Sequence, residues 1–293
     1  MLNKTYYGGQ AVIEGVMMRG RKTVVTSVRR PGGSIASLEK ELPSLYTGRL
    51  RRVPFIRGMV VLVEAMLLGI QSLLYSANVA LEEEMEEISK KTVFGMISTA
   101  AILVVALFFL APLFLTKAVN AFLPSSLAFH LAEGVIRLGI FIGYLKIISL
   151  MPDIKRVFTY HGAEHKTVNA YEAGVPLEVE AVQKYSTAHV RCGTSFLFAV
   201  LVLAIIVFTL VGRQDLWIMI ASRVVLIPII ASIGYEVTQF GARHTGNWLI
   251  KLTLMPGLLL QQMTTGEPDD DQVEVAVTAL RRVIELEEET TTA

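Results

Sequence analysis

The sequence predicts a predominantly α-helical, polytopic membrane protein with a small β meander near its N-terminus, and two observations carry this prediction. Hydrophobic residues make up 53% of the 293 residues and charged residues only 18%, whereas soluble domains contain about a quarter charged residues. The apolar residues also gather in long runs, of which 93–116 contains no charged side chain. Because about twenty apolar residues cross a hydrocarbon core, we expect about four transmembrane helices and one or two interfacial helices.

The charge balance and the cysteine count exclude several classes of protein. The 27 lysines and arginines nearly balance the 26 aspartates and glutamates, so the chain lacks the positive charge of a typical nucleic-acid binder. We therefore expect no sequence-specific nucleic-acid partner. A single cysteine excludes an internal disulfide and a zinc site built from several cysteines.

Residues 1–57 are expected to form a β-rich segment. Residues 11–14, 23–28 and 34–38 have the composition of strands, and a Pro-Gly-Gly turn separates the last two. These strands predict a three-stranded meander. Because so small a sheet is marginally stable alone, we expect it to pack on the segment 152–194.

The apolar runs predict two transmembrane hairpins, and two of their four spans carry ionisable residues. Such residues are costly at membrane depth and usually face a bundle interior or a wet cavity. Glu133 and Arg137 are four residues apart and are expected to pair on one helix face. Glu236 is expected to pair with Arg223 or Arg243. The sequence thus predicts a polar path of Glu133, Arg137, Arg223 and Glu236. The hairpins are 93–151, with spans 93–116 and 127–151, and 195–237, with spans 195–212 and 216–236.

Three further segments are expected to lie outside the spans. Residues 58–92 predict an interfacial helix with an acidic end rather than a fifth span, because their polar residues fall on one helical stripe. Residues 238–263 contain a central Pro-Gly break and predict an interfacial or re-entrant segment. Residues 264–293 predict a short amphipathic acidic helix with a frayed end. The polar stripe consists of Glu64, Gln71, Tyr75, Asn78 and Glu82.

The distribution of basic residues predicts the orientation. Four spans place the N-terminal segment, the segment 152–194 and the C-terminal tail on one side, and most of the lysines and arginines lie there. By the positive-inside rule, we expect a multi-pass plasma-membrane protein with both termini in the cytoplasm. The arginine run Arg49–Arg57 is expected to contact anionic lipid of the bilayer. A dock for a ribosome or translocon is the alternative that this run leaves open.

A histidine motif carries the candidate chemistry. His161-Gly162-Ala163-Glu164-His165 is an H-x-x-E-H pattern. On a helix its two imidazoles lie one turn apart on one face, where both can bind one divalent metal ion, with zinc expected. Glu164 is then placed to act as a general base.

A catalytic metal site needs a third protein ligand, and the sequence offers several residues. Glu172 lies seven residues after His165, and His189 and Cys192 form an H-x-x-C pair. Four ligands would close the site and make it structural, whereas three would leave it open for catalysis. Glu14 is either a ligand or base of this site or a solvent-exposed carboxylate on an edge strand. A hydrogen-bonded cluster without metal is the alternative for the histidines.

Several stretches of the chain resemble the bacterial YqhQ-type family. The stretches are residues 8–20 (GGQAVIEGVMMRG), His161 to Lys166, and residues 189–195 (HVRCGTS), together with the Pro256-Gly257-Leu258 segment. The likeness extends along nearly the whole chain. Members of this family are described as predicted metal-dependent membrane enzymes. The resemblance therefore implies a membrane location and a metal site at Glu14, His161, Glu164, His165, His189 and Cys192, but no substrate.

Three functions follow from these observations. The first is a metal-dependent hydrolase that acts on a membrane-protein segment or a lipid. The second is a non-catalytic scaffold or accessory factor in protein insertion, secretion or envelope assembly. The third is a small transporter that uses the polar path, for which a homo-oligomer would be expected because four or five spans make a small carrier.

Overall fold

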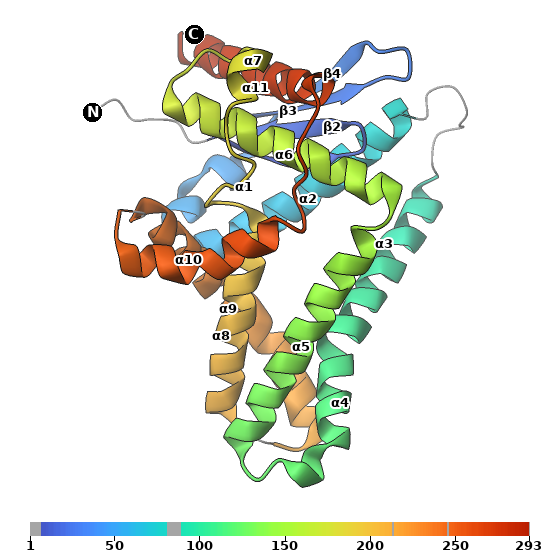
Figure 1. The fold of residues 1–293 in the computed structure, drawn as a ribbon, viewed down its shortest axis with the longest axis vertical. Helices are drawn as coiled ribbons and strands as arrows, with labels where there is room; N and C mark the ends of the chain where they lie inside the picture. Colours follow the sequence, from blue (N-terminus) through green and yellow to red (C-terminus); the bar gives the residue numbers. More distant parts are fainter. Residues whose placement is uncertain (1–6, 81–88, 213, 245, 293) are drawn as a thin grey trace. The chain divides into compact units, whose positions relative to one another are not determined.

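The computed structural model describes residues 7–80, 89–212, 214–244 and 246–292 (Figure 1). The acidic run 82–87 lies outside these residues. The chain forms two compact units, each built from separate stretches of the sequence. The first unit comprises Met1–Glu87, Ser149–Val190 and Leu258–Ala293, and the second comprises Ile88–Ile148 and Arg191–Gly257.

The first unit contains an antiparallel sheet of four strands in the order β1-β2-β3-β4. The expected meander had three strands. The expected strand 11–14 ends in a two-residue turn at Ile13 and Glu14, and the additional strand is the segment 15–19 after this turn, which was not expected. Glu14 has a φ of 51°, which non-glycine residues rarely adopt, so the sequence carries no common turn signal there. The strands are β1 (Gly8–Val12), β2 (Gly15–Arg19), β3 (Thr23–Arg29) and β4 (Ile35–Glu41).

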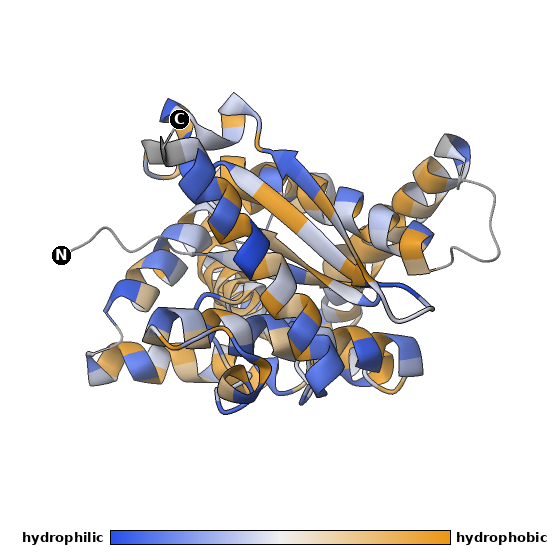
Figure 2. Ribbon diagram, turned by 90° about the horizontal axis from the view of Figure 1, so that it is seen from above, coloured by the Kyte–Doolittle hydropathy of each residue, from blue (hydrophilic) through white to orange (hydrophobic). Residues whose placement is uncertain are grey.

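Helices cover both faces of this sheet. Successive strand residues point to opposite faces, so Val16 and Met18 join a core with helices α6 (Pro152–Ala173) and α11 (Asp270–Thr292). Met17 and Val24 pack on the opposite face, where they meet helix α2 (Ile56–Ala80). Figure 2 shows the sheet from above, with hydrophobic residues on its strands. The sheet therefore packs on the segment 152–194, as expected, and on two further helices.

Helix α11 differs from the expected short helix with a frayed end. It is helical from Asp270 to Thr292. Its apolar face is buried against the sheet and α6, so packing holds the tail that the acidic composition alone would leave in solvent. The buried residues are Val273, Val275, Ala276, Val277, Ala279, Leu280 and Val283. The smaller helices of this unit are α1 (Ser44–Thr47), the 3₁₀ turn Arg49–Arg52 and α7 (Val179–Val182).

Helix α2 uses its polar stripe to hold the sheet. The Glu64 carboxylate is 2% exposed and accepts a hydrogen bond of 2.7 Å from Arg19 Nε of β2. Arg51, a member of the expected lipid-binding run, also pairs with Glu64. Ser72 Oγ lies 2.9 Å from Thr26 Oγ1 of β3. Glu64 of the stripe and Ser72 thus make contacts inside the protein, while the helix remains long and apolar enough to cross a membrane.

The second unit is a bundle of apolar helices. Among the described residues, four helices are long and apolar enough to span a membrane, namely α2 of the first unit, the joined stretch Lys91–Ala118, α8 and α9. The expected span at 127–151 corresponds to α5, which does not reach this standard by itself. The bundle consists of α3 (Lys90–Val105), a π turn (Ala106–Leu110), α4 (Ala111–Ala118), the 3₁₀ turn Asn120–Phe122, α5 (Ser126–Ile148), α8 (Gly193–Val211), α9 (Leu216–Arg243) and the first ten residues of α10 (Trp248–Gln261).

Helix α10 continues through the expected Pro-Gly break at Pro256. Proline removes only one backbone hydrogen bond, and apolar helices tolerate it where neighbours pack closely. A Cβ atom at Gly257 would lie 2.9 Å from Ser195 Oγ, so this glycine permits close packing against the start of α8.

Charged residues are buried together inside the second unit. Glu133, Arg137 and Arg223 are 2%, 7% and 4% exposed. Glu133 Oε1 accepts hydrogen bonds from Arg137 Nη2 at 2.7 Å and from Arg223 Nη2 at 2.5 Å. The expected pairing of Glu133 with Arg137 is therefore present, but the carboxylate partner of Arg223 is Glu133 rather than Glu236. Glu236 lies on α9, thirteen residues after Arg223.

Removing the Glu133 carboxylate should strongly destabilise the bundle. Glu133→Ala leaves two buried guanidinium groups without their shared carboxylate, and breaking a buried ion pair costs about 3–5 kcal/mol. We expect a markedly lower thermal unfolding midpoint in detergent. Lys146→Ala, which removes an exposed charge from the same helix, should change the midpoint little. Equal midpoints for the two variants would contradict the structural role of Glu133.

Candidate metal centre

Helix α6 places the H-x-x-E-H motif in the first unit. The helix begins at Pro152 and ends before Gly174, whose φ of 76° is a left-handed conformation that glycine adopts readily. The motif is therefore helical, as expected, and the ring centroids of His161 and His165 lie 4.4 Å apart.

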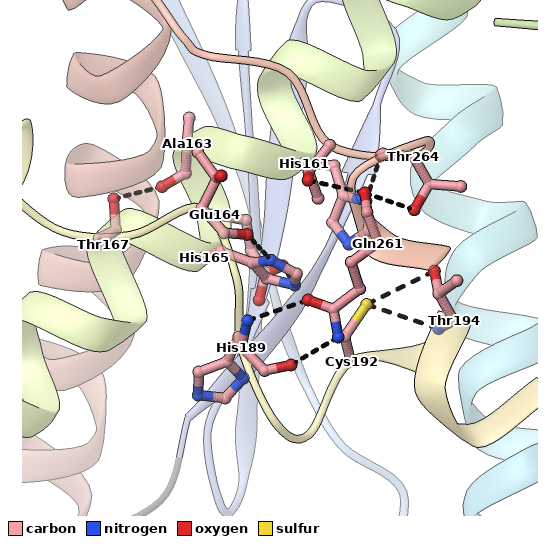
Figure 3. A network of polar contacts seen from close by, with 12 residues as sticks. His161, Ala163, Glu164, His165, Thr167, His189, Cys192, Thr194, Gln261 and Thr264 are labelled. Atoms are coloured by element: carbon pink, nitrogen blue, oxygen red, sulfur yellow. Dashed lines mark hydrogen bonds and ion pairs between the residues drawn. The ribbon is translucent and has the colours of Figure 1, made fainter. Parts of the chain in front are cut away.

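Two main-chain carbonyls fix the orientation of the histidine rings, and Figure 3 shows the one that Thr264 provides to His161. His161 Nδ1 lies 2.8 Å from the Thr264 oxygen, and His165 Nδ1 lies 2.5 Å from the Thr187 oxygen. A carbonyl oxygen only accepts, so each Nδ1 donates a proton, and in the neutral ring the lone pair is on Nε2. Metal-binding histidines are oriented by hydrogen bonds of this kind.

Glycines bring one of these carbonyl segments against α6. A Cβ atom at Gly162 would lie 2.0 Å from the Gly266 oxygen, so no side chain fits between the two segments. The Gly266 N–H donates to the Phe158 oxygen at 2.8 Å. The glycine inside the motif therefore lets the segment 264–266 reach His161.

Glu164 lies beside the histidines and against the sheet. Its carboxylate Oε2 is 3.6 Å from His165 Nε2, and the residue is 5% exposed. A Cβ atom at Gly9 of β1 would lie 3.0 Å from Glu164 Cγ. The buried carboxylate thus stands between the histidine pair and the first strand.

His189 and Glu172 form a neighbouring pair. His189 Nε2 is 3.7 Å from Glu172 Oε2, and the His189 ring centroid is 5.6 Å from that of His165. His189 is 7% exposed, and its Nε2 makes no hydrogen bond to the part of the chain that the structure describes. The Gln261 side chain makes two hydrogen bonds to the main chain of His189. Its Oε1 accepts from the His189 N–H at 3.0 Å, and its Nε2 donates to the His189 oxygen at 2.8 Å.

The ligand atoms of His161 and His165 lie within 4.8 Å of each other. Among the described residues of the first unit, no third His, Cys, Asp or Glu joins both at this distance. His189 and Glu172 as metal ligands therefore stay predictions. Cys192 belongs to the second unit, where it caps α8 and its Sγ accepts from the Thr194 N–H at 3.5 Å.

Glu14 lies in the turn between β1 and β2 and binds the first half of α6. Its Oε2 accepts from Arg156 Nη2 at 2.6 Å and lies 3.3 Å from the Tyr160 hydroxyl, which can donate to it. Burial raises the pKa of Tyr160, and the negative charge of Glu14 raises it further. Glu14 thus attaches α6 to the sheet. Whether it also serves as a ligand or base stays a prediction.

Sequence reasoning gave no role to the residues that orient the site. Gln261 and Thr264 follow the Pro256-Gly257-Leu258 segment of the family resemblance without a pattern that indicates a role, and Thr187 has no distinguishing pattern around it. Thr264 and Thr187 act through main-chain oxygens, which every residue type provides, so their identity carries no signal.

The described residues thus contain four helices that are apolar and long enough to cross a membrane, of which α2 belongs to the sheet-and-helix unit. The same unit carries the pair of His161 and the buried His165. The chain belongs to the family described as "Protein of unknown function (DUF1385)", whose model matches residues 53–286. It is 37% identical over 297 aligned residues to the "Uncharacterized protein YqhQ" of Bacillus subtilis (strain 168), covering 96% of this chain and 93% of that protein. The family resemblance is therefore confirmed. No solved structure matches this chain significantly.

Replacing Gln261 should loosen the His189 segment. Gln261→Leu leaves a buried N–H and a buried carbonyl of His189 without partners, and each such loss costs about 1–3 kcal/mol. We expect faster amide hydrogen exchange in residues 186–190 and a lower unfolding midpoint. The neighbouring Gln262→Leu changes an exposed side chain and is the matched control. Unchanged exchange in Gln261→Leu would contradict the anchoring role.

Proposed function

We propose that this protein is a metal-dependent hydrolase of the bacterial plasma membrane, with its site in the sheet-and-helix unit. One observation carries the proposal. Both histidines of the motif, on adjacent turns of α6, donate Nδ1–H to main-chain carbonyls. In each neutral ring, the lone pair that can bind a metal ion is therefore on Nε2. Histidines that only fill a core have no need for this shared orientation, whereas metal ligands do.

His161 and His165 are the proposed first two ligands, and we assign Cys192 as the third. Cys192 follows His189 by only three positions, and Gln261 holds His189 within the first unit. Three extended residues reach about 10 Å. A set of two nitrogens and one sulfur suits Zn²⁺ and leaves one position open. When bound there, the ion would polarise water or a substrate carbonyl.

Glu164 is the proposed general base. Its carboxylate is buried and lies within 3.6 Å of His165 Nε2, so a proton taken from water would move only a short distance to it. His189 and Glu172 are proposed to hold the wall of the site beside His165. The four described helices that are apolar and long enough would hold the protein in the membrane. By the positive-inside rule, we propose that the site faces the cytoplasm.

Elemental analysis of the detergent-purified protein tests this proposal. We expect about one zinc per chain in the wild type, because histidine and thiolate ligands favour zinc. The double variant His161→Ala/His165→Ala should lose the metal, and Cys192→Ser should bind it more weakly. Glu164→Gln should keep the metal and lose hydrolytic activity.

Glu267→Gln is the control for these variants. It removes an exposed carboxylate that pairs with Lys166 of α6, the helix that carries the histidine motif. It should keep both metal and activity. A wild-type protein without stoichiometric metal would refute the metal proposal and favour a non-catalytic scaffold in protein insertion or secretion. Translocon or ribosomal proteins that co-purify equally with the double-histidine variant would then support that alternative.

A further inference from the structure

The outer edge of β1 offers unused backbone hydrogen-bonding groups. In antiparallel strands, residues alternate between those bonded to one neighbour and those that face the other way. Two hydrogen bonds, from Gly20 N–H to the Thr23 oxygen and from Arg29 N–H to the Glu14 oxygen, show that the even-numbered residues of β2 bond to β3. The odd-numbered residues of β2 therefore bond to β1. With the register of β1 on β2, this pattern directs the N–H and C=O groups of Gly9 and Ala11 away from the sheet.

These groups have no partner within the described ranges of the chain. β1 is an end strand that pairs only with β2, and no hydrogen bond from another described residue reaches the main chain of Gly9 or Ala11. Gly8 is exposed, and a Cβ atom built on it meets nothing within 4 Å.

The two edges of the sheet differ in their protection. Natural proteins protect edge strands with charged side chains, and β4 follows this rule with Glu39, Lys40 and Glu41. Glu39 is further held by Arg282 of α11, at 2.6 Å between Arg282 Nε and Glu39 Oε1. β1 has the sequence Gly-Gly-Gln-Ala-Val without a charge. One edge is therefore blocked against pairing, while the other is suited to it.

The unprotected edge lies next to the proposed catalytic carboxylate. Gly9 packs on Glu164, whose Cγ would lie 3.0 Å from a Cβ atom at that position. Glu164 in turn lies 3.6 Å from His165. A chain paired with Gly9 and Ala11 would therefore run beside Glu164.

We propose that an extended polypeptide segment binds as a fifth strand on the outer edge of β1, and that this segment is the substrate. Strand addition uses main-chain hydrogen bonds, which a lipid cannot supply. This inference rests on the proposed hydrolase function. In the reaction, water adds across the peptide bond, the carbon–nitrogen bond breaks, the oxygen goes to the carbonyl carbon, and the leaving amine takes a proton.

Binding of a labelled peptide to the full-length protein in nanodiscs tests the inference. The probe is a fluorescein-labelled heptapeptide of alternating threonine and valine, and the readout is fluorescence anisotropy. Ala11→Pro removes the outward N–H and places its ring at the edge, while the bonds of β1 to β2 remain. We expect binding to weaken about tenfold or more, because several backbone hydrogen bonds are lost together.

Glu41→Pro is the matched control, because the N–H of Glu41 also faces outward, at the opposite edge. It should bind as the wild type does. A second probe avoids any question of folding. Two N-methylated versions of the same heptapeptide are compared, one methylated on its threonines and the other on its valines. At least one of them should bind wild-type protein about tenfold more weakly than the unmodified peptide does. Absence of binding by the unmodified peptide, or equal binding of all the peptides, would overturn the inference.

The binding assay and the metal assay fail independently. Peptide binding that Ala11→Pro abolishes, in a protein without zinc, would keep the docking edge and refute the hydrolase. Zinc-dependent cleavage that Ala11→Pro leaves unchanged would refute the docking edge and keep the hydrolase.

Discussion

Each imidazole of the α6 motif donates a proton to a main-chain carbonyl, and the site depends on these two hydrogen bonds. They come from segments far apart in the sequence, the Thr264 oxygen for His161 and the Thr187 oxygen for His165. A side-chain acceptor could rotate away, whereas a carbonyl in a packed segment holds its place. The shared orientation of the two rings is therefore a property of the fold rather than of the motif.

The rest of the first unit holds these two segments in position. Gly162 allows the segment 264–266 to lie against α6. Gln261 makes two hydrogen bonds to the main chain of His189, two residues after Thr187. Lys166 donates to the Gln183 oxygen at 2.8 Å and attaches the α7 region to the same helix. Below them, the core that α6 shares with α11 and the sheet fixes the helix itself. A single helix thus joins the hydrophobic core to the candidate chemistry.

Local patterns predicted much of the fold and part of the site. The apolar runs and the spacing of His161 and His165 are periodic features of the sequence, so helices could be predicted from them. The turn at Glu14 was not predicted because a left-handed glutamate has no sequence signature. The full length of helix α11 was not predicted because burial of its apolar face, rather than its composition, keeps the acidic tail helical. Arg223 pairs with Glu133 rather than Glu236, since the choice depends on packing between helices. The carbonyls that orient the histidines were beyond prediction for the same reason.

The central claim is that His161, His165 and Cys192 hold one zinc ion. X-ray absorption at the zinc edge of the purified wild-type protein tests it most directly. We expect a first shell with two nitrogens at about 2.0 Å and one sulfur at about 2.3 Å, and the loss of the sulfur contribution in Cys192→Ser. A first shell of oxygen atoms alone, as for an ion bound loosely to surface carboxylates, would contradict it.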